Sequence, residues 1–364
     1  METKITKSSI QDSALKAVLP HKRCTAVGGT GVGKTLLGLK HMSAKYHDTI
    51  KYLVVASKVS IFEEWKNQAM EHGYENLLPH IRFCTYFSLT KQNFNDDIVY
   101  FDEIHNLLET HEPWLIKSEA EMLGLTGTPP VNRWSKKYKI INKYCPIVFE
   151  YAVDDAVKDG VINDYEVIVH MLDLDERKNI PVKTKTGNIF YTSEKANYDY
   201  WTGRVDAAET PKQRQIASVM RMKQMKSFKS KEILAKKIFD GTINKTIMFA
   251  GTKQQADALG SHTYYSGNPK SKENLAKFKT GEVTKLVAIN QLSEGVNIPN
   301  LKEGIIIHSY SGNSPKTRQM FGRLLRLFPN EKCTLVILCY RNTVDEGWVA
   351  ENLSVLDPSK IIYV

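Results

Sequence analysis

The stretch that decides the fold is Gly28-Gly29-Thr30-Gly31-Val32-Gly33-Lys34-Thr35. It follows the apolar run Thr25–Val27 and precedes the helical pattern of residues 36–45, which is the strand–loop–helix order of a phosphate-binding P-loop. Glycines let backbone N–H groups close around phosphate oxygens at a helix N-terminus. Lys34 would add a cation at the β- and γ-phosphates, and Thr35 a hydroxyl ligand for Mg²⁺. The stretch therefore predicts a nucleoside triphosphate site in an α/β fold.

Apolar runs alternate with helical patterns in two parts of the chain. The first part contains the runs Tyr52–Ala56, Ile81–Tyr86, Ile98–Phe101 and Met122–Thr126. The second part contains Thr246–Ala250, Leu286–Ile289, Gly304–His308 and Thr334–Cys339. This alternation predicts parallel sheets covered by helices. We expect two α/β lobes, at residues 1–150 and 241–364, joined by an accessory segment at residues 151–240.

The accessory segment has a different pattern. We expect a strand at Glu166–Asp173 and a β-hairpin at Asn179–Thr192, with Thr186-Gly187-Asn188 near its tip. Residues 211–239 carry nine basic side chains and one acid, Glu232. The basic residues are Lys212, Arg214, Arg221, Lys223, Lys226, Lys229, Lys231, Lys236 and Lys237. They form either a solvated helix face or a surface that contacts phosphates. The helical spacing of Ile216, Val219 and Met220 predicts a stripe that packs on a lobe.

Composition sets broad limits on function. The 364 residues carry a formal net charge of +10, and the pI is about 9.1, which favours polyanionic partners. The five cysteines form no CxxC pair, so we expect buried, reduced thiols rather than a zinc site or a disulfide framework. Neither a signal peptide nor a long apolar run is present, which predicts a cytoplasmic protein that does not bind membranes.

Two further motifs carry chemistry. Asp102-Glu103-Ile104-His105 follows the apolar run Ile98–Phe101, so its carboxylates fall at the carboxyl end of a strand, where α/β sheets bind ligands. Asp102 is suited to hold Mg²⁺, and Glu103 to activate the attacking water. Farther on, Arg323 and Arg326 are three residues apart and share a helix face, from which guanidinium groups can contact phosphoryl oxygens.

The ordered set of motifs resembles superfamily 2 helicases and translocases. The DExH box at residues 102–105 comes with sequences similar to the family's motifs Ia, Ib, III, IV, V and VI. These sequences are Leu53–Lys58, Thr85-Tyr86, Leu125–Pro129, Ile247–Lys253, Ser293–Pro299 and Gln319–Arg326. Residues 151–160 resemble the segment that leaves the first lobe in type III restriction-like, UvsW-type and Swi2/Snf2-like motors. A compact chain of this kind also resembles phage or plasmid helicases.

This resemblance implies roles for further residues. Two RecA-like lobes would hold ATP and Mg²⁺ between them, with Gln11, Gly295 and Asn297 near the nucleotide and Gln319 beside the arginine fingers Arg323 and Arg326. Asn297 departs from the aspartate common at that place in motif V, and Gln11 could equally be a surface glutamine. His105, Thr126 and Thr128 would couple the ATP site to the rest of the motor. Nucleic acid would contact Ser57, Lys58, Thr85, Tyr86, Arg221, Lys223, Lys226, Gly251, Thr252, Lys253, Asn290 and Gln291.

The sequence thus predicts a monomeric, nucleic-acid-stimulated ATPase that works as a DNA helicase or translocase, in a prokaryotic or phage-infected cell. Three alternatives stay open: a translocase that remodels duplex or branched DNA without processive unwinding, an RNA helicase, and an ATP-gated binding module that does not move. The histidine at position 105 favours DNA over RNA, because DEAD-box RNA helicases carry aspartate there. The hairpin at Asn179–Thr192 is a candidate strand-separating or duplex-gripping element, and simple structural packing is its alternative.

Overall fold

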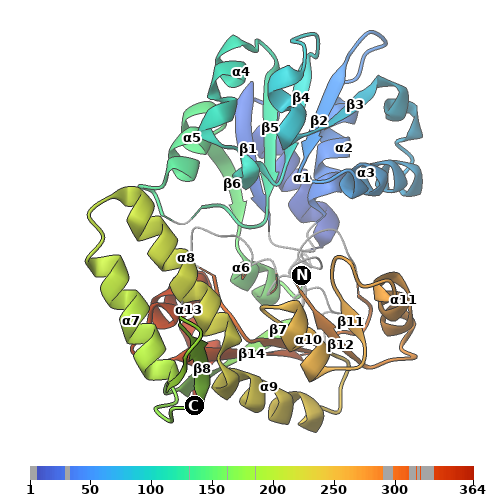
Figure 1. The fold of residues 1–364 in the computed structure, drawn as a ribbon. Coiled ribbons are helices and arrows are strands. Elements are labelled where there is room, and N and C mark those ends of the chain that lie inside the picture. Colours follow the sequence, from blue (N-terminus) through green and yellow to red (C-terminus); the bar gives the residue numbers. More distant parts are fainter. Residues whose placement is uncertain are drawn as a thin grey trace.

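The computed structural model describes residues 6–28, 33–130, 132–161, 163–184, 186–289, 298–310, 317, 320 and 332–364. Figure 1 shows two α/β lobes, one above the other. This arrangement confirms the prediction of two lobes with parallel sheets.

Lobe 1 is built on a six-stranded sheet in the order β3-β2-β4-β5-β1-β6, and all of its strands run parallel. Its strands are β1 (Arg23–Gly28), β2 (Tyr52–Ala56), β3 (Ile81–Thr85), β4 (Ile98–Asp102), β5 (Glu121–Thr126) and β6 (Ile147–Tyr151). Its helices are α1 (Lys7–Val18), α2 (Lys34–Ala44), α3 (Ser60–Glu71), α4 (Glu112–Lys117) and α5 (Lys136–Tyr144). Short 3₁₀ turns η1 (Glu75–His80), η2 (Tyr86–Lys91), η3 (Ile104–Asn106) and η4 (Glu109–His111) join them.

Strand β2 shows why this sheet is covered on both faces. All five of its residues are buried. Tyr52, Val54 and Ala56 belong to one apolar cluster, whereas Leu53 and Val55 belong to another on the opposite face. Successive side chains of a strand point to opposite faces, so an unbroken apolar run needs helices on both sides.

Lobe 2 has a seven-stranded sheet in the order β11-β12-β10-β13-β14-β7-β15, with every described strand pair parallel. Its strands are β7 (Asp164–Leu172), β10 (Thr246–Phe249), β11 (Thr263–Tyr264), β12 (Lys285–Ala288), β13 (Glu303–Ile306), β14 (Lys332–Tyr340) and β15 (Ile361–Tyr363). Its helices are α6 (Val153–Lys158), α9 (Lys229–Gly241), α10 (Lys253–Leu259), α11 (Ser271–Thr280), α13 (Val344–Leu353) and the 3₁₀ turn η6 (Pro358–Lys360).

Strand β7 changes how the accessory segment is understood. It was expected within residues 151–240, outside either lobe, but it pairs with β14 over nine residues and with β15. The hairpin β8 (Ile180–Lys183) and β9 (Ile189–Thr192) forms as expected, with Gly187 in the left-handed region at its turn. It is followed by α7 (Glu194–Asp206) and α8 (Pro211–Ser227), which we call the two-helix arm. The boundaries at residues 150 and 240 remain predictions, and the strand pairing assigns β7 to the second sheet.

The two-helix arm is anchored to lobe 2 at one end. Tyr198 and Met225 pack with Phe228 and Tyr340 in a small apolar cluster, and Glu194 accepts hydrogen bonds from Ser230 N and Oγ at 3.0 and 2.6 Å. The expected packing stripe is wrong, because Ile216 and Val219 are 55% and 50% exposed. Ala217 and Met225 are the buried residues of α8.

Candidate nucleotide-binding and hydrolysis site

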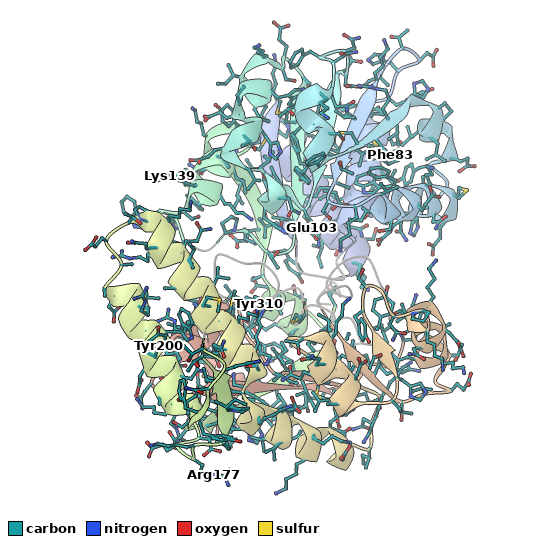
Figure 2. All side chains as sticks on the ribbon, in the orientation of Figure 1. Phe83, Glu103, Lys139, Arg177, Tyr200 and Tyr310 are labelled. Carbon is teal, nitrogen blue, oxygen red and sulfur yellow. The ribbon has the colours of Figure 1, made fainter. Side chains whose placement is uncertain are left out.

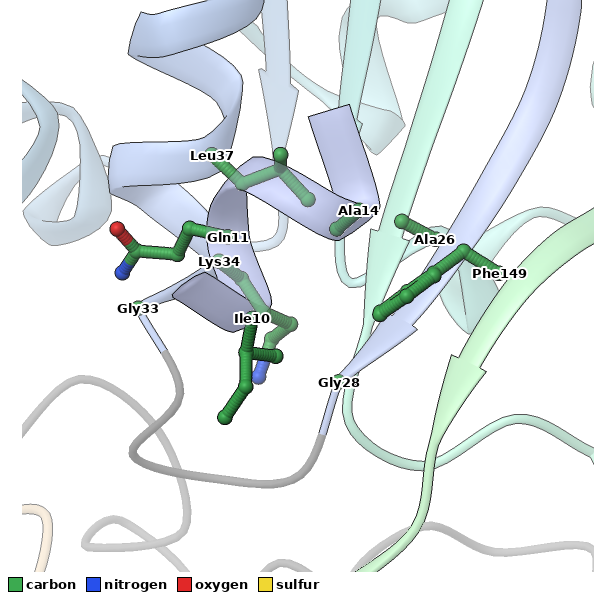
Figure 3. A pocket seen from close by; sticks show the side chains of 9 residues that line it. All are labelled: Ile10, Gln11, Ala14, Ala26, Gly28, Gly33, Lys34, Leu37 and Phe149. Carbon is green, nitrogen blue, oxygen red and sulfur yellow. The ribbon is translucent and has the colours of Figure 1, made fainter. Parts of the chain in front are cut away.

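The two ends of the P-loop are positioned by β1 and α2. Strand β1 ends at Gly28, and α2 begins at Lys34 after Gly33, whose φ of 87° lies in the left-handed region. A Cβ atom on Gly33 would lie 2.3 Å from Nε2 of Gln11, so glycine is needed there both for the backbone and for the close approach of that side chain. Figure 3 shows Gln11 and Lys34 beside Gly33. Gly29, Thr30, Gly31 and Val32 lie outside the described residues.

An open pocket of about 430 Å³ adjoins this end of α2. Gln11, Gly33 and Tyr74 contribute to its lining, together with Lys7, Ser8, Leu36, Lys40, Gln68 and His72. Gln11 is 6% exposed, which disfavours its interpretation as a surface glutamine. Its side-chain amide can both donate and accept, as recognition of a nucleobase edge requires. The role of Gln11 in adenine binding stays a prediction.

Asp102 is the last residue of β4 and is 8% exposed. Its Oδ2 accepts a hydrogen bond from Nε1 of Trp65 at 2.9 Å, and its carbonyl accepts one from the Tyr86 hydroxyl at 2.9 Å. The indole can approach because residue 38 is glycine: a Cβ there would lie 2.5 Å from the Trp65 ring. Trp65 therefore fixes one oxygen of the carboxylate while the other can face a ligand.

Glu103 follows in a left-handed conformation, with φ 53° and ψ 59°. This geometry is uncommon for a residue with a side chain and is often associated with functional sites. Its Oε1 lies 3.7 Å from Nζ of Lys34, and its Oε2 accepts a hydrogen bond from Oγ1 of Thr126 at 3.2 Å. Figure 2 shows Glu103 at the edge of lobe 1 that faces lobe 2.

The two neighbouring carboxyl groups differ in acidity. Burial, and then the charge of Glu103, raise the pKa of Asp102 to about 7, although the Trp65 N–H opposes this shift. Burial also disfavours the charged form of Glu103. The charges of Lys34 and His105 and hydrogen bonds from Thr126 and the Gly127 backbone outweigh it, so the pKa of Glu103 is lowered. A carboxyl group with a lowered pKa is suited to accept a proton from water as a general base.

His105 and the loop after β5 continue the network away from the carboxylates. Nδ1 of His105 is 2.9 Å from Oγ1 of Thr126 and 3.4 Å from Oγ1 of Thr128. The same Thr126 hydroxyl accepts the Thr128 backbone N–H at 3.1 Å. The structure thus brings together Lys34, Glu103, His105, Thr126 and Thr128 from separate motifs. Thr35 lies beside them in the first turn of α2.

Several predicted residues lie outside the described part of the chain. They are Asn290, Gln291, Gly295, Asn297, Gln319, Arg323 and Arg326. Of the motif VI stretch, Met320 is described and is buried in the core of lobe 2. Just before the stretch, the buried Thr317 accepts the backbone N–H of Tyr310 through its Oγ1 at 3.0 Å. The roles given to the arginines remain proposals.

The structure does not support every predicted nucleic-acid contact. Tyr86 is 6% exposed, and its hydroxyl is bound to Asp102, so its side chain belongs to the core of lobe 1. Thr85 and Thr252 each cap a helical turn, with Thr252 Oγ1 accepting from Gln255 N at 3.1 Å. Lys253 is exposed at the start of α10, after Gly251. Ser57 and Lys58 directly follow β2, at the edge of the sheet that carries Asp102.

The basic residues of 211–239 also divide into structural and exposed groups. Lys231 is fully buried, forms an ion pair with Asp345 and lies 4.5 Å from the Tyr340 ring centroid, so it cannot contact nucleic acid. In the arm, Lys223 is exposed. Arg221 lies over the Tyr198 ring at 5.7 Å, and Lys226 over the Tyr310 ring at 4.6 Å. Of the three arm residues predicted to contact nucleic acid, Lys223 is therefore the exposed one, whereas Arg221 and Lys226 lie against aromatic rings.

Sequence reasoning missed the roles of Trp65 and Gly38. Trp65 is 0% exposed and reaches Asp102 from α3, and Gly38 is the fourth residue after Lys34 along α2. A signal was present, because a glycine inside a helix is unfavourable unless a neighbour needs the space. The identity of that neighbour depends on the packing of α2 against α3, which sequence spacing alone does not reveal.

Comparison with known proteins agrees with this geometry. Residues 4–131 match the family model described as type III restriction enzyme, res subunit, and residues 229–328 match the helicase conserved C-terminal domain. The chain has the motor core of a superfamily 2 helicase or translocase. Motors of these families are ATPases that use a divalent metal and act on nucleic acid.

A curated relative and two solved structures indicate how far this similarity extends. The DNA 3'-5' translocase XPB2 of Sulfurisphaera tokodaii is 26% identical over 95% of this chain and 84% of its own length. The type ISP restriction-modification enzyme LlaBIII bound to DNA has a TM-score of 0.63 at 14% identity, and this chain spans only 31% of that larger protein. Saccharomyces cerevisiae Dbp5 bound to RNA has a TM-score of 0.57 at 14% identity, with 98% of this chain and 89% of Dbp5 covered. These two structures support the fold alone.

Proposed function

We propose that this chain is an ATP-dependent DNA translocase or helicase that couples hydrolysis at the carboxyl edge of the lobe 1 sheet to movement of lobe 2. The observation that carries the proposal is the contact network from Lys34 through Glu103 to Thr126 and His105. It joins the P-loop lysine, the candidate base and the loop after β5. A change at the γ-phosphate can therefore reach residues outside the nucleotide site.

In this proposal Lys34 stabilises the phosphate charge, and Glu103 accepts the proton of the attacking water. Asp102 and Thr35 offer the hard oxygen donors that Mg²⁺ prefers, so the residues present fit that ion. When bound, Mg²⁺ would neutralise charge on the phosphate oxygens. Gln11 would contact the base, with Gly295 and Asn297 near the nucleotide. Gln319, Arg323 and Arg326 would complete the site from lobe 2, which makes turnover depend on lobe closure.

DNA is proposed as the track because XPB2, which aligns with 95% of this chain, is a DNA 3'-5' translocase by name. The same relative supports movement from 3' to 5'. A translocase that does not unwind processively is the main alternative, and the hairpin β8–β9 is the element whose removal would separate the two activities. An RNA helicase is supported only by fold similarity to Dbp5.

The decisive experiment measures ATP turnover of the wild-type protein with single-stranded DNA, duplex DNA, branched DNA and RNA at matched nucleotide concentration. We expect DNA to stimulate turnover more strongly than RNA. Glu103→Gln should abolish stimulated turnover while retaining ATP binding, because a neutral amide cannot accept the proton. Strong stimulation by RNA alone would favour the RNA helicase, and no stimulation by any nucleic acid would contradict a motor function.

A monomer that works in the cytoplasm of a prokaryotic or phage-infected cell is part of the same proposal. Among the helices that the structure describes, none is long and apolar enough to span a bilayer. Sedimentation of the protein with and without DNA would test the monomeric state.

A further inference from the structure

An exposed indole lies just beyond the loop that contacts Glu103 and His105. Trp134 is 83% exposed and comes six residues after Thr128. The surrounding backbone is ordered by local hydrogen bonds: the Trp134 N–H donates to Oδ1 of Asn132 at 2.9 Å, and Ser135 caps α5 by accepting from Tyr138 N at 3.1 Å. An indole offers a large flat aromatic face, and one held out on an ordered turn is available for stacking.

The segment around this indole is strongly basic. Residues 132–145 contain Arg133, Lys136, Lys137, Lys139 and Lys143 and no acid. Nζ of Lys139 lies 5.9 Å from the centroid of the Trp134 ring. Lys136 and Lys143 pair with Glu109 and Glu112 of the neighbouring turns. Arg133, Lys137 and Lys139 remain as positive charge close to Trp134 along the chain.

The place of this segment in the fold is also informative. Strand β5 ends at Thr126, so the segment leaves the sheet at the same edge as Asp102 and Gly28. Figure 2 shows Lys139 at the border of lobe 1 on the side toward lobe 2. A ligand at Trp134 would therefore touch the polypeptide that leads directly from Thr126 and Thr128.

We infer that Trp134 is a stacking platform for an unpaired base of single-stranded nucleic acid, with Arg133 and Lys139 contacting the flanking phosphates. This inference rests on the proposed function. Aromatic faces accept any base, and adjacent cations hold the backbone, which is how motors grip single strands without reading sequence. A protein partner fits less well, because the residues on either side, Asn132-Arg133 and Ser135-Lys136-Lys137, are polar or charged.

The test compares two oligomers of equal length without nucleotide present: oligothymidylate and an abasic phosphodiester. Trp134→Ala should weaken binding of oligothymidylate about 5- to 150-fold, the range expected for loss of one base–aromatic stack. Binding of the abasic oligomer should be unchanged, because its phosphates meet the same cations. Trp134→Phe should retain most of the affinity. Tyr46→Ala is the control, because it removes another exposed aromatic side chain, which lies just after the C-terminal end of α2. Its affinity for both oligomers should match that of the wild type.

Two results would overturn the inference. Unchanged oligothymidylate affinity in Trp134→Ala would show that no base stacks there, even if DNA still stimulates ATP turnover. Equal losses on both oligomers would show that the ring acts through phosphates or local folding. Absence of nucleic-acid-stimulated turnover in the wild type would instead contradict the proposed function, while the direct binding comparison would still decide whether a base stacks on Trp134.

Discussion

The indole N–H of Trp65 donates a hydrogen bond to Oδ2 of Asp102 over 2.9 Å, with both side chains buried. Trp65 comes from α3 and Asp102 from the end of β4, so the contact joins a helix to the carboxyl edge of the lobe 1 sheet. It leaves the carboxylate oriented before any cation arrives. Loss of a hydrogen-bond partner of a metal ligand typically lowers metal affinity or activity by about 10- to 100-fold.

Trp65→Phe should therefore raise the Mg²⁺ concentration needed for half-maximal ATP turnover by about 10-fold or more. Phenylalanine keeps a smaller aromatic ring at this buried position, but the carboxylate loses its fixed donor. Trp114→Phe is the matched control, because Trp114 is also buried and donates its N–H to the carbonyl of Gln92 at 3.2 Å, away from the carboxylates. Equal Mg²⁺ requirements in Trp65→Phe and the wild type would contradict this account.

Thr126→Val should reduce nucleic-acid-stimulated turnover more than it reduces basal turnover. The substitution keeps the shape but removes the hydroxyl that contacts Glu103, His105 and the Thr128 N–H. A stability loss of about 1–3 kcal/mol is also expected from the unsatisfied Thr128 donor. Thr25→Val, on the adjacent strand, removes a buried hydroxyl bound to the Cys145 carbonyl at 2.6 Å. Thr25→Val should lower stability without changing how strongly nucleic acid stimulates turnover. Equal effects of Thr25→Val and Thr126→Val on this stimulation would refute a coupling role for Thr126.

Lys231→Met should destabilise the protein by about 3–5 kcal/mol, because Asp345 would be left buried and charged. Both members of the pair are nearly inaccessible, at 1% and 3% side-chain exposure. The double variant Lys231→Met/Asp345→Asn should recover much of the loss, since the amide is neutral and can still accept the Tyr340 N–H, which lies 3.1 Å from Oδ2 of Asp345. Denaturant unfolding measures the free energy of unfolding of the single and the double variant. A single variant as stable as the wild type would show that the ion pair contributes nothing.

Lys223→Glu should weaken duplex DNA binding and make its log–log dependence on salt shallower by about 0.9 for each phosphate that the side chain no longer neutralises. Lys236→Glu makes the same charge change on α9, where Lys236 already pairs with Asp240 at 2.6 Å. Lys236→Glu should therefore change duplex DNA affinity and its salt dependence less than Lys223→Glu does. If both variants show the same affinity and slope, then Lys223 makes no specific phosphate contact and affects DNA binding only through net charge.

Much of the fold could be predicted from sequence because its signals are local. The apolar run Tyr52–Ala56 coincides with β2, and the helical pattern of residues 36–45 falls on α2, which spans Lys34–Ala44. The hairpin turn followed from Gly187. The pairing of β7 with β14 could not be foreseen, since those strands are far apart in the chain and any parallel partner satisfies the same apolar pattern.

The errors in the arm and around Tyr86 have physical causes as well. Helical spacing identifies which side chains share a face, but α8 packs through Ala217 and Met225, and Ile216 and Val219 of its apolar stripe stay exposed. Lys231 looked like one more exposed cation because its partner, Asp345, is 114 residues away. Tyr86 was expected to contact nucleic acid, but its hydroxyl donates to the Asp102 carbonyl, a partner that sequence spacing does not reveal.

The hairpin β8–β9 and the two-helix arm are inserted between β7 and β10, two strands of one sheet. Both ends of this insert are therefore connected to lobe 2, and neither end is attached to lobe 1. Its length or shape could change over evolution without disturbing strand register on either side of it. Related motors could thus acquire a new substrate preference by exchanging this one module while the ATP-hydrolysing core stays as it was.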